Sequence, residues 1–486
     1  MNKSRNLTLL TDLYQVNMAY AYYQSGTAEK QVVFDVFFRK NPCGNGYTVA
    51  AGLEQVVDYI RHFHFDDEDL DYLKDTQGYS ANFIEYLRNL SFSGDIDAVP
   101  EGTWVFPHEP ILRVKAHLIQ AQLLETTILT LLNHQSLIAT KTARIVEAAG
   151  EDPVLEFGLR RAQGPDAGVY GARAAFIGGA AATSNLMAGK CFHIPVRGTH
   201  AHSFVQSFDD ELSAFRAFAA TFPQRTILLV DTYDTLSQGI PNAIRVFREM
   251  RKTHGDTFQN FGIRLDSGDL AYLSKSARKM LDEAGFPEAK IAASSDLDEY
   301  LIQDLKAQGA RIDIWGVGTN LITSSSCPAL AGVYKLAARE RDGVLAPEIK
   351  RSDNPDKINN PGLKKLVRFR NKDTREAILD LIMLEEEPVP TDAFLAFDPV
   401  HPWKKKRIED FEVEPLLKPI FKDGELVYDL PEIDEIRHYA ATEKRSFSKE
   451  VRRLTNPHIY HVDLSEQLFH LKQQLLEAVR NHSKSN

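Results

Sequence analysis

Cysteine is scarce in this sequence, which holds only three cysteines in 486 residues. None belongs to a C-x-x-C pair, so neither a disulfide framework nor a zinc site is expected, and this fits a reducing cytosol. No apolar run approaches the ~20 residues that a membrane helix requires. The first residues, MNKSRNLTLLTDLYQ, lack the apolar region of a signal peptide. We therefore expect a cytoplasmic protein of several domains without membrane contact.

Two common nucleotide-binding loops are also missing. The sequence has no G-x-x-x-x-G-K-[ST] and no G-x-G-x-x-G, so any ATP site is of another kind. Basic residues are outnumbered, with Lys+Arg 57 against Asp+Glu 67 and a formal net charge of -10. A negative surface argues against nucleic acid as the main partner. Local basic patches can still bind phosphates.

A regular pattern begins near residue 150, where short apolar runs alternate with polar turns and helical stretches. The runs are VLEF (154–157), IPV (194–196), TILLV (226–230), FGIRL (261–265), KIAA (290–293) and IDIW (312–315), and helices are expected at 209–221, 241–253, 268–284 and 296–308. Strands alternating with helices predict a parallel α/β sheet, and this spacing favours an incomplete βα barrel over a doubly wound open sheet. In a barrel, the turns that follow the strands meet on one face, where sites are built.

The segment GVGTN (316–320) is the first candidate at this face. Its glycines let backbone N–H groups approach an anion, and Thr319 adds a hydroxyl. A glycine turn after a strand is common, so the motif alone is a weak signal. Ser294 and Ser295 end the preceding strand, and adjacent strand ends can bind one phosphate together.

Two histidines lie close together in RGTHAHS (197–203). Packing or helix capping is the more common role for such residues. Neutral imidazole is also a good phosphoryl acceptor near pH 7. A metal pair is the third reading, although no H-E-x-x-H is present.

Acidic and basic residues follow two further strands. In IRLDSGDL (263–270), Asp269 is expected to cap a helix, whereas Asp266 and Arg264 should point to the same side. That pair suits a sugar phosphate: the arginine binds the anion, and the acid stabilises a positive sugar carbon or binds Mg²⁺. In EFGLRRAQG (156–164), the arginines suit a carboxylate or phosphate, or form surface ion pairs.

Two other features have ordinary explanations when taken alone. Tyr14, on a short helix, would be a core aromatic residue. The basic run through Lys350, Lys357, Lys364 and Lys365 is typical of a solvated loop.

Taken together, the motifs resemble the nicotinate phosphoribosyltransferase family. The matching segments are TDLYQ (11–15), FFRKNP (37–42), EFGLRRAQGPD (156–166), GTHAHSFVQS (199–207), VDTYDT (230–235), RLDSGDL (264–270), SSDLDE (294–299), WGVGT (315–319), PALAGVYKL (328–336) and NNPGLKK (359–365). They keep their order over nearly the whole chain, which makes the series far more specific than any single member.

The resemblance implies an irregular βα barrel and a second, smaller α/β domain built from both ends of the chain. The expected domains are an N-terminal α/β domain at 1–135, the barrel with the phosphoribosyl site at 136–328, and a C-terminal segment at 329–486 that packs back on the first domain. It also implies a homodimer whose active sites combine both subunits.

The resemblance further implies roles for individual residues. His202 matches the histidine that ATP phosphorylates, and Asp266 matches an acid near the ribose. Nicotinate would be bound by Tyr14, Phe157, Arg160 and Arg264, and phosphate groups by Arg39, Ser294, Ser295, Gly316, Gly318 and Thr319. Tyr14 and Arg39 would come from the partner subunit.

The implied activity joins nicotinate to phosphoribosyl pyrophosphate, with ATP as co-substrate and Mg²⁺ accompanying the phosphates. The nicotinamide and quinolinate phosphoribosyltransferases, and a catalytically silent relative that senses nucleotides, are the alternatives. The chain departs from the family pattern at Ala181, where an acid is expected in many relatives, and this puts one contact of that loop in doubt.

Overall fold

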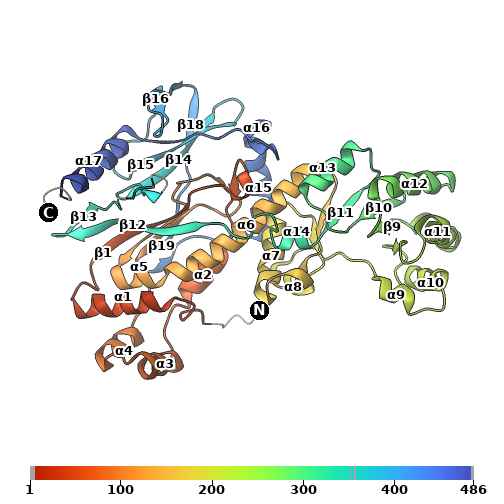
Figure 1. Ribbon diagram of the computed structural model, residues 1–486, viewed down its shortest axis with the longest axis horizontal. Helices are drawn as coiled ribbons and strands as arrows, with labels where there is room; N and C mark the ends of the chain where they lie inside the picture. Colours follow the sequence, from red (N-terminus) through yellow and green to blue (C-terminus); the bar gives the residue numbers. More distant parts are fainter. Residues whose placement is uncertain (1–5, 351, 355–356, 483–486) are drawn as a thin grey trace. The chain divides into compact units, whose positions relative to one another are not determined.

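The structure is a computed structural model that describes residues 6–350, 352–354 and 357–482. The chain divides into two compact units (Figure 1). Unit 1 combines both ends of the chain, Met1–Leu137 and Ala329–Asn486, and unit 2 is the middle of the chain, Ile138–Pro328. Unit 1 is the larger, so the prediction that the domain built from the chain's ends is the smaller one was wrong. The C-terminal part of the chain contributes strands to the sheets of unit 1.

A parallel sheet organises unit 2. Within the described residues it has six strands in the order β7-β6-β11-β10-β9-β8. The strands are β6 (Val154–Glu156), β7 (Ala182–Thr183), β8 (Ile227–Leu229), β9 (Gly262–Leu265), β10 (Lys290–Ala293) and β11 (Ile314–Val317). The predicted parallel α/β organisation is confirmed. The edge strands β7 and β8 are not paired with each other among these residues, and the predicted barrel stays a prediction in that detail.

Most predicted strands of unit 2 lie within a residue or two of their expected place. The last one is displaced by two residues, because β11 includes Gly316 and Val317, which were expected in the turn. The run at 194–196 contributes only an isolated bridge between Val196 and Thr183. Strand β7, two residues long, was missed because so short an element leaves no recognisable run.

Helices follow these strands as the sequence predicts, and aspartates begin several of them. The side chains of Asp210, Asp269 and Asp298 each accept a backbone N–H of the first helical turn. The helices of unit 2 are η2 (Leu159–Arg161), α7 (Pro165–Ile177), α8 (Leu186–Phe192), α9 (His202–Gln206), α10 (Glu211–Thr221), η3 (Thr235–Gly239), α11 (Ile240–His254), η4 (Gly255–Thr257), α12 (Leu270–Glu283), α13 (Glu299–Ala307) and α14 (Thr319–Ile322). Helix α6 (Glu125–Ala149) begins in unit 1 and ends in unit 2.

Unit 1 is built on a larger sheet whose strand pairs are all antiparallel within the described residues. In the described chain this sheet runs β13-β12-β1-β5-β3-β19-β20, with β1 paired antiparallel to β12 and β5. Its strands are β1 (Gln31–Phe38), β3 (Asp95–Ala98), β5 (Leu112–His117), β12 (Gly332–Arg341), β13 (Val344–Pro347), β19 (Lys418–Lys422) and β20 (Glu425–Leu426). The N-terminal strands β1, β5 and β3 therefore form the centre of this sheet, and strands from the later part of the chain flank them on both sides.

Smaller sheets and helices complete unit 1. The strands are β14 (Lys364–Asn371), β15 (Ala377–Leu384), β18 (Phe411–Pro415) and β21 (Val462–Leu464) in one sheet, β16 (Phe394–Phe397) with β17 (Lys405–Ile408), and β2 (Thr48–Val49) with β4 (Trp104–Val105). The helices are α1 (Leu13–Gln24), η1 (Pro42–Gly44), α2 (Leu53–Arg61), α3 (Asp67–Gln77), α4 (Ala81–Arg88), α5 (Leu118–Leu123), α15 (Ile433–Ser446), α16 (Lys449–Arg452) and α17 (Glu466–His482). Helices α1, α3 and α4 belong to the red-to-orange part of the chain in Figure 1.

The prediction that the basic run is a solvated loop was wrong for Lys364. This side chain is 2% exposed and its Nζ lies 2.7 Å from Oδ2 of Asp35 on β1. Arg368, on the same strand β14, is fully buried against Asp380 and Glu443. Buried charges of this kind require a partner, because an unpaired ion is costly to remove from water. The basic run therefore includes part of the core of unit 1.

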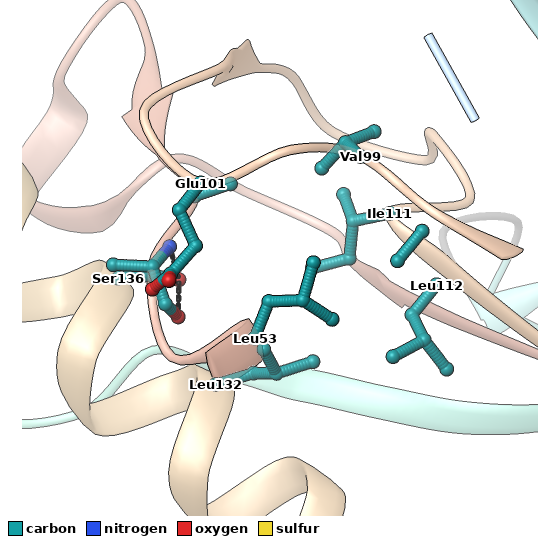
Figure 2. Close-up of a pocket in the computed structure, with 10 residues that line it drawn as sticks. Leu53, Val99, Glu101, Ile111, Leu112, Leu132 and Ser136 are labelled. Atoms are coloured by element: carbon teal, nitrogen blue, oxygen red, sulfur yellow. Dashed lines mark hydrogen bonds between the residues drawn. The ribbon is translucent and has the colours of Figure 1, made fainter. Parts of the chain in front are cut away.

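A small cavity lies inside unit 1 (Figure 2). Apolar side chains line most of it, including Leu53, Ile111 and Leu132. The Ser136 hydroxyl accepts from the N–H of Ala51 at 3.1 Å and lies 3.2 Å from its carbonyl oxygen. None of the predicted site residues lines this cavity, so we assign it to core packing. Over the described part of the chain, no helix is long and apolar enough to cross a membrane.

Candidate active site

Polar side chains gather at the carboxyl ends of the parallel strands of unit 2. Arg264, on β9, lies at the centre of this cluster and is 16% exposed. Its Nε donates to Oγ of Ser294 at 2.8 Å, its Nη1 to Oγ1 of Thr199 at 3.0 Å, and its Nη2 to Oδ1 of Asp266 at 2.6 Å. These bonds join the ends of β9 and β10 to the histidine loop. The expectation that Arg264 and Asp266 point to the same side is confirmed.

The Asp266 carboxylate is enclosed by this network. The Ser294 hydroxyl donates to its Oδ1, and Nε2 of His202 lies 3.7 Å from its Oδ2. Burial raises the pKa of the Asp266 carboxyl, but the hydrogen bond from Ser294 and the positive charge of Arg264 outweigh it, so the pKa lies below its ordinary value. Asp266 is therefore ionised at neutral pH.

A second aspartate holds the turn that carries Asp266. Asp231 lies two residues after the end of β8, and its Oδ2 accepts from the backbone N–H of Asp266 at 2.8 Å and from the Ser267 hydroxyl at 2.7 Å. Its Oδ1 is buried and has no hydrogen-bond partner within the described residues. Asp231 fixes the position of Asp266 and keeps one oxygen available to a donor or cation.

The two histidines of the loop have different surroundings. His202 begins α9 with its side chain 39% exposed, and its Nδ1 lies 3.1 Å from Oγ1 of Thr232. His200 is buried beside Phe204, Phe215 and Phe218, and its Nε2 accepts from the backbone N–H of Leu229 at 3.2 Å.

Burial lowers the pKa of His200 to about 4, which keeps this ring neutral. The packing role therefore fits His200, and the exposed nucleophile role fits His202. Within the described ranges, no group of three or more His, Cys, Asp or Glu side chains is arranged to hold a metal ion.

The aromatic side of the cluster is formed by Phe157, which follows β6. The guanidinium carbon of Arg264 lies 5.9 Å from the centre of its ring. A Cβ on Gly316 would come within 2.7 Å of this ring, so the position next to it requires glycine. Arg160 lies on the following turn η2 and is exposed. The structure thus joins Phe157 to the Arg264 cluster and leaves Arg160 facing solvent.

The turn after β10 has an unusual backbone. Ser295 and Asp296 have φ values of 98° and 38°, a region that costs a non-glycine residue roughly 1–3 kcal/mol. Within the described protein, no acceptor binds the backbone N–H groups of Ser295, Asp296 or Leu297. Successive unpaired N–H groups of this kind form an anion-binding concavity. The Ser294 hydroxyl, in contrast, is engaged by Arg264 and Asp266.

The turn after β11 lies beside it. Gly318 and Thr319 begin the short helix α14, and Asn320 donates from Nδ2 to the carbonyl oxygens of Asp296 at 2.8 Å and Leu297 at 3.2 Å. The two turns expected to share a phosphate are therefore adjacent. Of the glycines in this motif, only Gly318 is in the turn.

Three other positions were predicted to belong to the site or were in doubt. Tyr14, on α1, is 50% exposed, and Arg39, directly after β1, has a buried Nε without a partner among the described residues. Both belong to unit 1, and their contribution to a partner's site stays a prediction. Ala181 precedes β7, and its N–H donates to the carbonyl of Val154 at 2.8 Å, a contact that needs no acidic side chain.

Sequence reasoning gave no site role to Thr199, Asp231, Thr232 or Asn320. The first three lie inside segments that resemble the family, and Asn320 directly follows the predicted phosphate-binding residue Thr319. Hydroxyl and amide side chains beside strand ends were the available signal. Their partners lie up to 65 residues away in sequence, as for Thr199 and Arg264, so the pairing itself could not be read locally.

The chain is similar to several known proteins. Family models described as the N-terminal and C-terminal domains of nicotinate phosphoribosyltransferase match residues 9–133 and 363–472. A Bacillus subtilis (strain 168) protein named nicotinate phosphoribosyltransferase is 51% identical over 480 residues, covering 99% of this chain and 97% of that protein. A protein of the same name from Caenorhabditis elegans is 39% identical, with 95% and 92% covered.

Two solved structures are also similar to this chain. The crystal structure of human nicotinic acid phosphoribosyltransferase has a TM-score of 0.82 at 32% identity, covering 96% of this chain and 100% of that one. A nicotinate-nucleotide pyrophosphorylase from Pyrococcus furiosus has a TM-score of 0.67 at 23% identity over 90% and 95% of the two chains, a likeness of fold. With half of its residues identical to a relative that it matches over nearly its full length, the chain belongs to the nicotinate phosphoribosyltransferase family.

Proposed function

We propose that this protein forms nicotinate mononucleotide and pyrophosphate from nicotinate and phosphoribosyl pyrophosphate, and couples the reaction to ATP hydrolysis through a phosphohistidine at His202. The contact of His202 with Asp266 and Thr232 carries the proposal. It places a partly exposed imidazole beside an ionised carboxylate, within an arginine-containing site. This arrangement suits a phosphoryl acceptor better than a packing residue.

The neighbours of His202 favour one tautomer. An N–H on Nε2 directed at the Asp266 carboxylate is favourable, whereas a lone pair there would be repelled. The lone pair then lies on Nδ1, where the Thr232 hydroxyl can donate to it. In the first step Nδ1 bonds to the γ-phosphorus of ATP, the bond to the bridging oxygen breaks, and ADP leaves with that electron pair. The Asp266 carboxylate stabilises the positive charge that the ring gains.

Nicotinate would bind on the aromatic side of the cluster. Phe157 offers one ring face, and Tyr14 of the partner subunit would cover the other. Bonds to the described residues occupy four of the five N–H groups of Arg264, which leaves one Nη2–H for a ligand. Arg160 is exposed and can turn toward the carboxylate. Two cations favour anionic nicotinate over neutral nicotinamide.

The phosphoribosyl end would lie against the turns after β10 and β11. The unpaired N–H groups at Ser295, together with Gly318 and Thr319, suit the 5′-phosphate. Arg39 of the partner subunit would add a positive charge. Because the Ser294 hydroxyl is already engaged, we assign Ser294 to holding Asp266 and Arg264 in place. Gly316 serves the phosphate only indirectly, through its place in β11.

In the transfer step, the ring nitrogen of nicotinate forms a bond to the anomeric carbon as the bond to pyrophosphate breaks. Pyrophosphate leaves with the electron pair, and the sugar carbon is positively charged in the transition state. Asp266 stabilises that charge. Mg²⁺ would arrive with the pyrophosphate of the substrate, and the unpaired Oδ1 of Asp231 suits a magnesium-bound water. Hydrolysis of phospho-His202 then resets the site.

A site to which both subunits contribute requires a homodimer. The substrates belong to cytoplasmic metabolism, so the proposed location is the cytoplasm.

The test is product formation from nicotinate and phosphoribosyl pyrophosphate, with and without ATP, with nicotinamide in parallel. Nicotinate mononucleotide that increases with ATP, without a nicotinamide product, is the expected result. A preference for nicotinamide would overturn the assigned substrate.

The silent-relative alternative has a separate test. Incubation with [γ-³²P]ATP should label the protein with a phosphate that is labile in acid and stable in base. A protein that binds nucleotides but is neither labelled nor active would favour a sensing role. The ionised Asp266 and the exposed His202 argue against this outcome, since a sensor needs neither.

A further inference from the structure

One side chain joins the turns that follow β10 and β11. The carboxamide of Asn320 donates from Nδ2 to the carbonyl oxygens of Asp296 and Leu297. Its Oδ1 accepts from the Ser325 hydroxyl at 2.7 Å, which orients the amide. Asn320 therefore binds the carbonyl side of the turn after β10 and leaves the N–H side open.

Both ends of this turn are anchored independently. At the start, the N–H of Ser294 donates to the carbonyl of Leu265 at 2.9 Å. At the end, Asp298 caps α13, and the fully buried Glu299 pairs with Lys141 at 2.5 Å and Arg144 at 2.9 Å. The anchored ends keep the fold of unit 2 independent of what happens between them.

The middle of the turn has less support. Ser295 and Asp296 are the residues with positive φ, and their N–H groups are unpaired within the described protein. Over the described part of the chain, the hydrogen bonds that restrain this middle portion are those from Asn320 to Asp296 and Leu297. A strained backbone persists only where its surroundings hold it. Asn320 is the group that holds it here.

We propose that Asn320 is a positioning residue for the phosphate end of the phosphoribosyl substrate. It keeps the strained turn in the conformation that presents consecutive N–H groups to one phosphate, next to the start of α14. The inference rests on the proposed function and goes beyond it, since it assigns a role to a side chain that need not touch substrate. Losing the amide would let the turn relax and would weaken phosphate binding, while the nicotinate side at Phe157 and Arg264 stays intact.

The variants are Asn320→Ala, which removes both hydrogen bonds, and Ser325→Ala, which removes only the group that orients the amide. Thr323→Val is the matched control, because Thr323 lies just after α14 and, among the residues that the structure describes, its hydroxyl bonds to the carbonyl of Thr319 alone. Asn320→Ala should raise the KM for phosphoribosyl pyrophosphate about tenfold, the change that about 1.4 kcal/mol produces. The KM for nicotinate and kcat should change less than about twofold, and Ser325→Ala should show a smaller effect of the same kind, on the scale of one weakened hydrogen bond.

Thermal unfolding and calorimetric titration with ribose 5-phosphate complete the test. Folded Asn320→Ala protein that binds ribose 5-phosphate more weakly than wild type supports the proposal. Unchanged KM and unchanged ribose 5-phosphate binding overturn it, and so does a loss shared equally by both substrates, which a general structural role would give. The activity of the wild-type protein is measured first. If the wild type has no phosphoribosyltransferase activity, the proposed function itself is overturned.

Discussion

Gly316 lies directly against the ring of Phe157. A Cβ at this position would be 2.7 Å from Cδ2 and 2.8 Å from Cε2 of that ring, well inside the contact distance of about 3.5–4.0 Å. Gly316 is also part of β11 rather than of the turn after it. The glycine therefore sets the position of the aromatic ring.

The first prediction follows from this contact. Gly316→Ala should displace the Phe157 ring and raise the KM for nicotinate about tenfold, because a displaced ring loses a stacking contact of about 0.5–1.5 kcal/mol. The KM for phosphoribosyl pyrophosphate should stay within about twofold of wild type and serves as the internal control. Steady-state kinetics with each substrate varied in turn measure both. If only the KM for phosphoribosyl pyrophosphate changed, Gly316 would belong to the phosphate site instead.

The second prediction concerns coupling to ATP. His202→Ala removes the phosphoryl acceptor but leaves Asp266, Arg264 and Ser294 bonded to one another, so basal transfer should remain and stimulation by ATP should disappear. His193→Asn, at the exposed end of α8, is the control, and it should keep both basal transfer and stimulation by ATP. Product formation is measured with and without ATP. Persistent ATP stimulation in the His202 variant would show that another residue is phosphorylated.

The third prediction concerns the acid limb of the pH profile. Asp266 must be ionised to act, and Ser294 is one of the groups that lower its pKa. Ser294→Ala should raise that pKa toward its ordinary value, so activity should begin to fall at a higher pH than in wild type as the solution is acidified. The measurement is kcat/KM from about pH 7 down to about pH 3, because the ordinary pKa of an aspartate is about 3.9. An acid limb at the wild-type position would mean that Arg264 alone keeps Asp266 ionised.

The fourth prediction is a test of stability in unit 1. Asp463, on β21, is 5% exposed, and burial together with the nearby negative charge of Asp398 raises its pKa to about 7. The folded protein therefore retains a proton at Asp463 that the unfolded chain releases near pH 4. The free energy of unfolding therefore falls as the pH rises from about 4 to 7. Above pH 7 the total loss is on the order of 4 kcal/mol.

Asp463→Asn removes the titrating group. We expect its melting temperature to exceed that of wild type by several degrees at pH 8 and to approach it near pH 4. Asp410→Asn makes the same charge change at an exposed turn and should have little effect at either pH. A difference between Asp463→Asn and wild type that does not depend on pH would contradict the shifted pKa.

Much of unit 2 could be predicted because its pattern is local. Short apolar runs followed by aspartate-capped helices predict parallel strands, and parallel strands end on one edge of a sheet. The polar residues directly after those runs, such as Asp266 and Ser294, were therefore expected to meet, and they do. The order of the motifs along the chain was sufficient to identify the family.

Several features depended on packing between distant segments. Lys364 looked like a loop residue until β14 placed it beside Asp35, and the two histidines of one loop could not be distinguished until Phe215 and Phe218 covered His200. Local sequence carries no information about such distances.

The sequence by itself determined the alternation of strands and helices, the residue types at the strand ends and the family, because periodicity and turn chemistry act over a few residues. The tertiary structure decided which of those residues are partners. It placed Gly316 under an aromatic ring, bonded Ser294 to Asp266, and set Asn320 across a strained turn. Each of these pairings joins positions that lie 24 to 159 residues apart in the chain, and only the packing of the sheet brings them together.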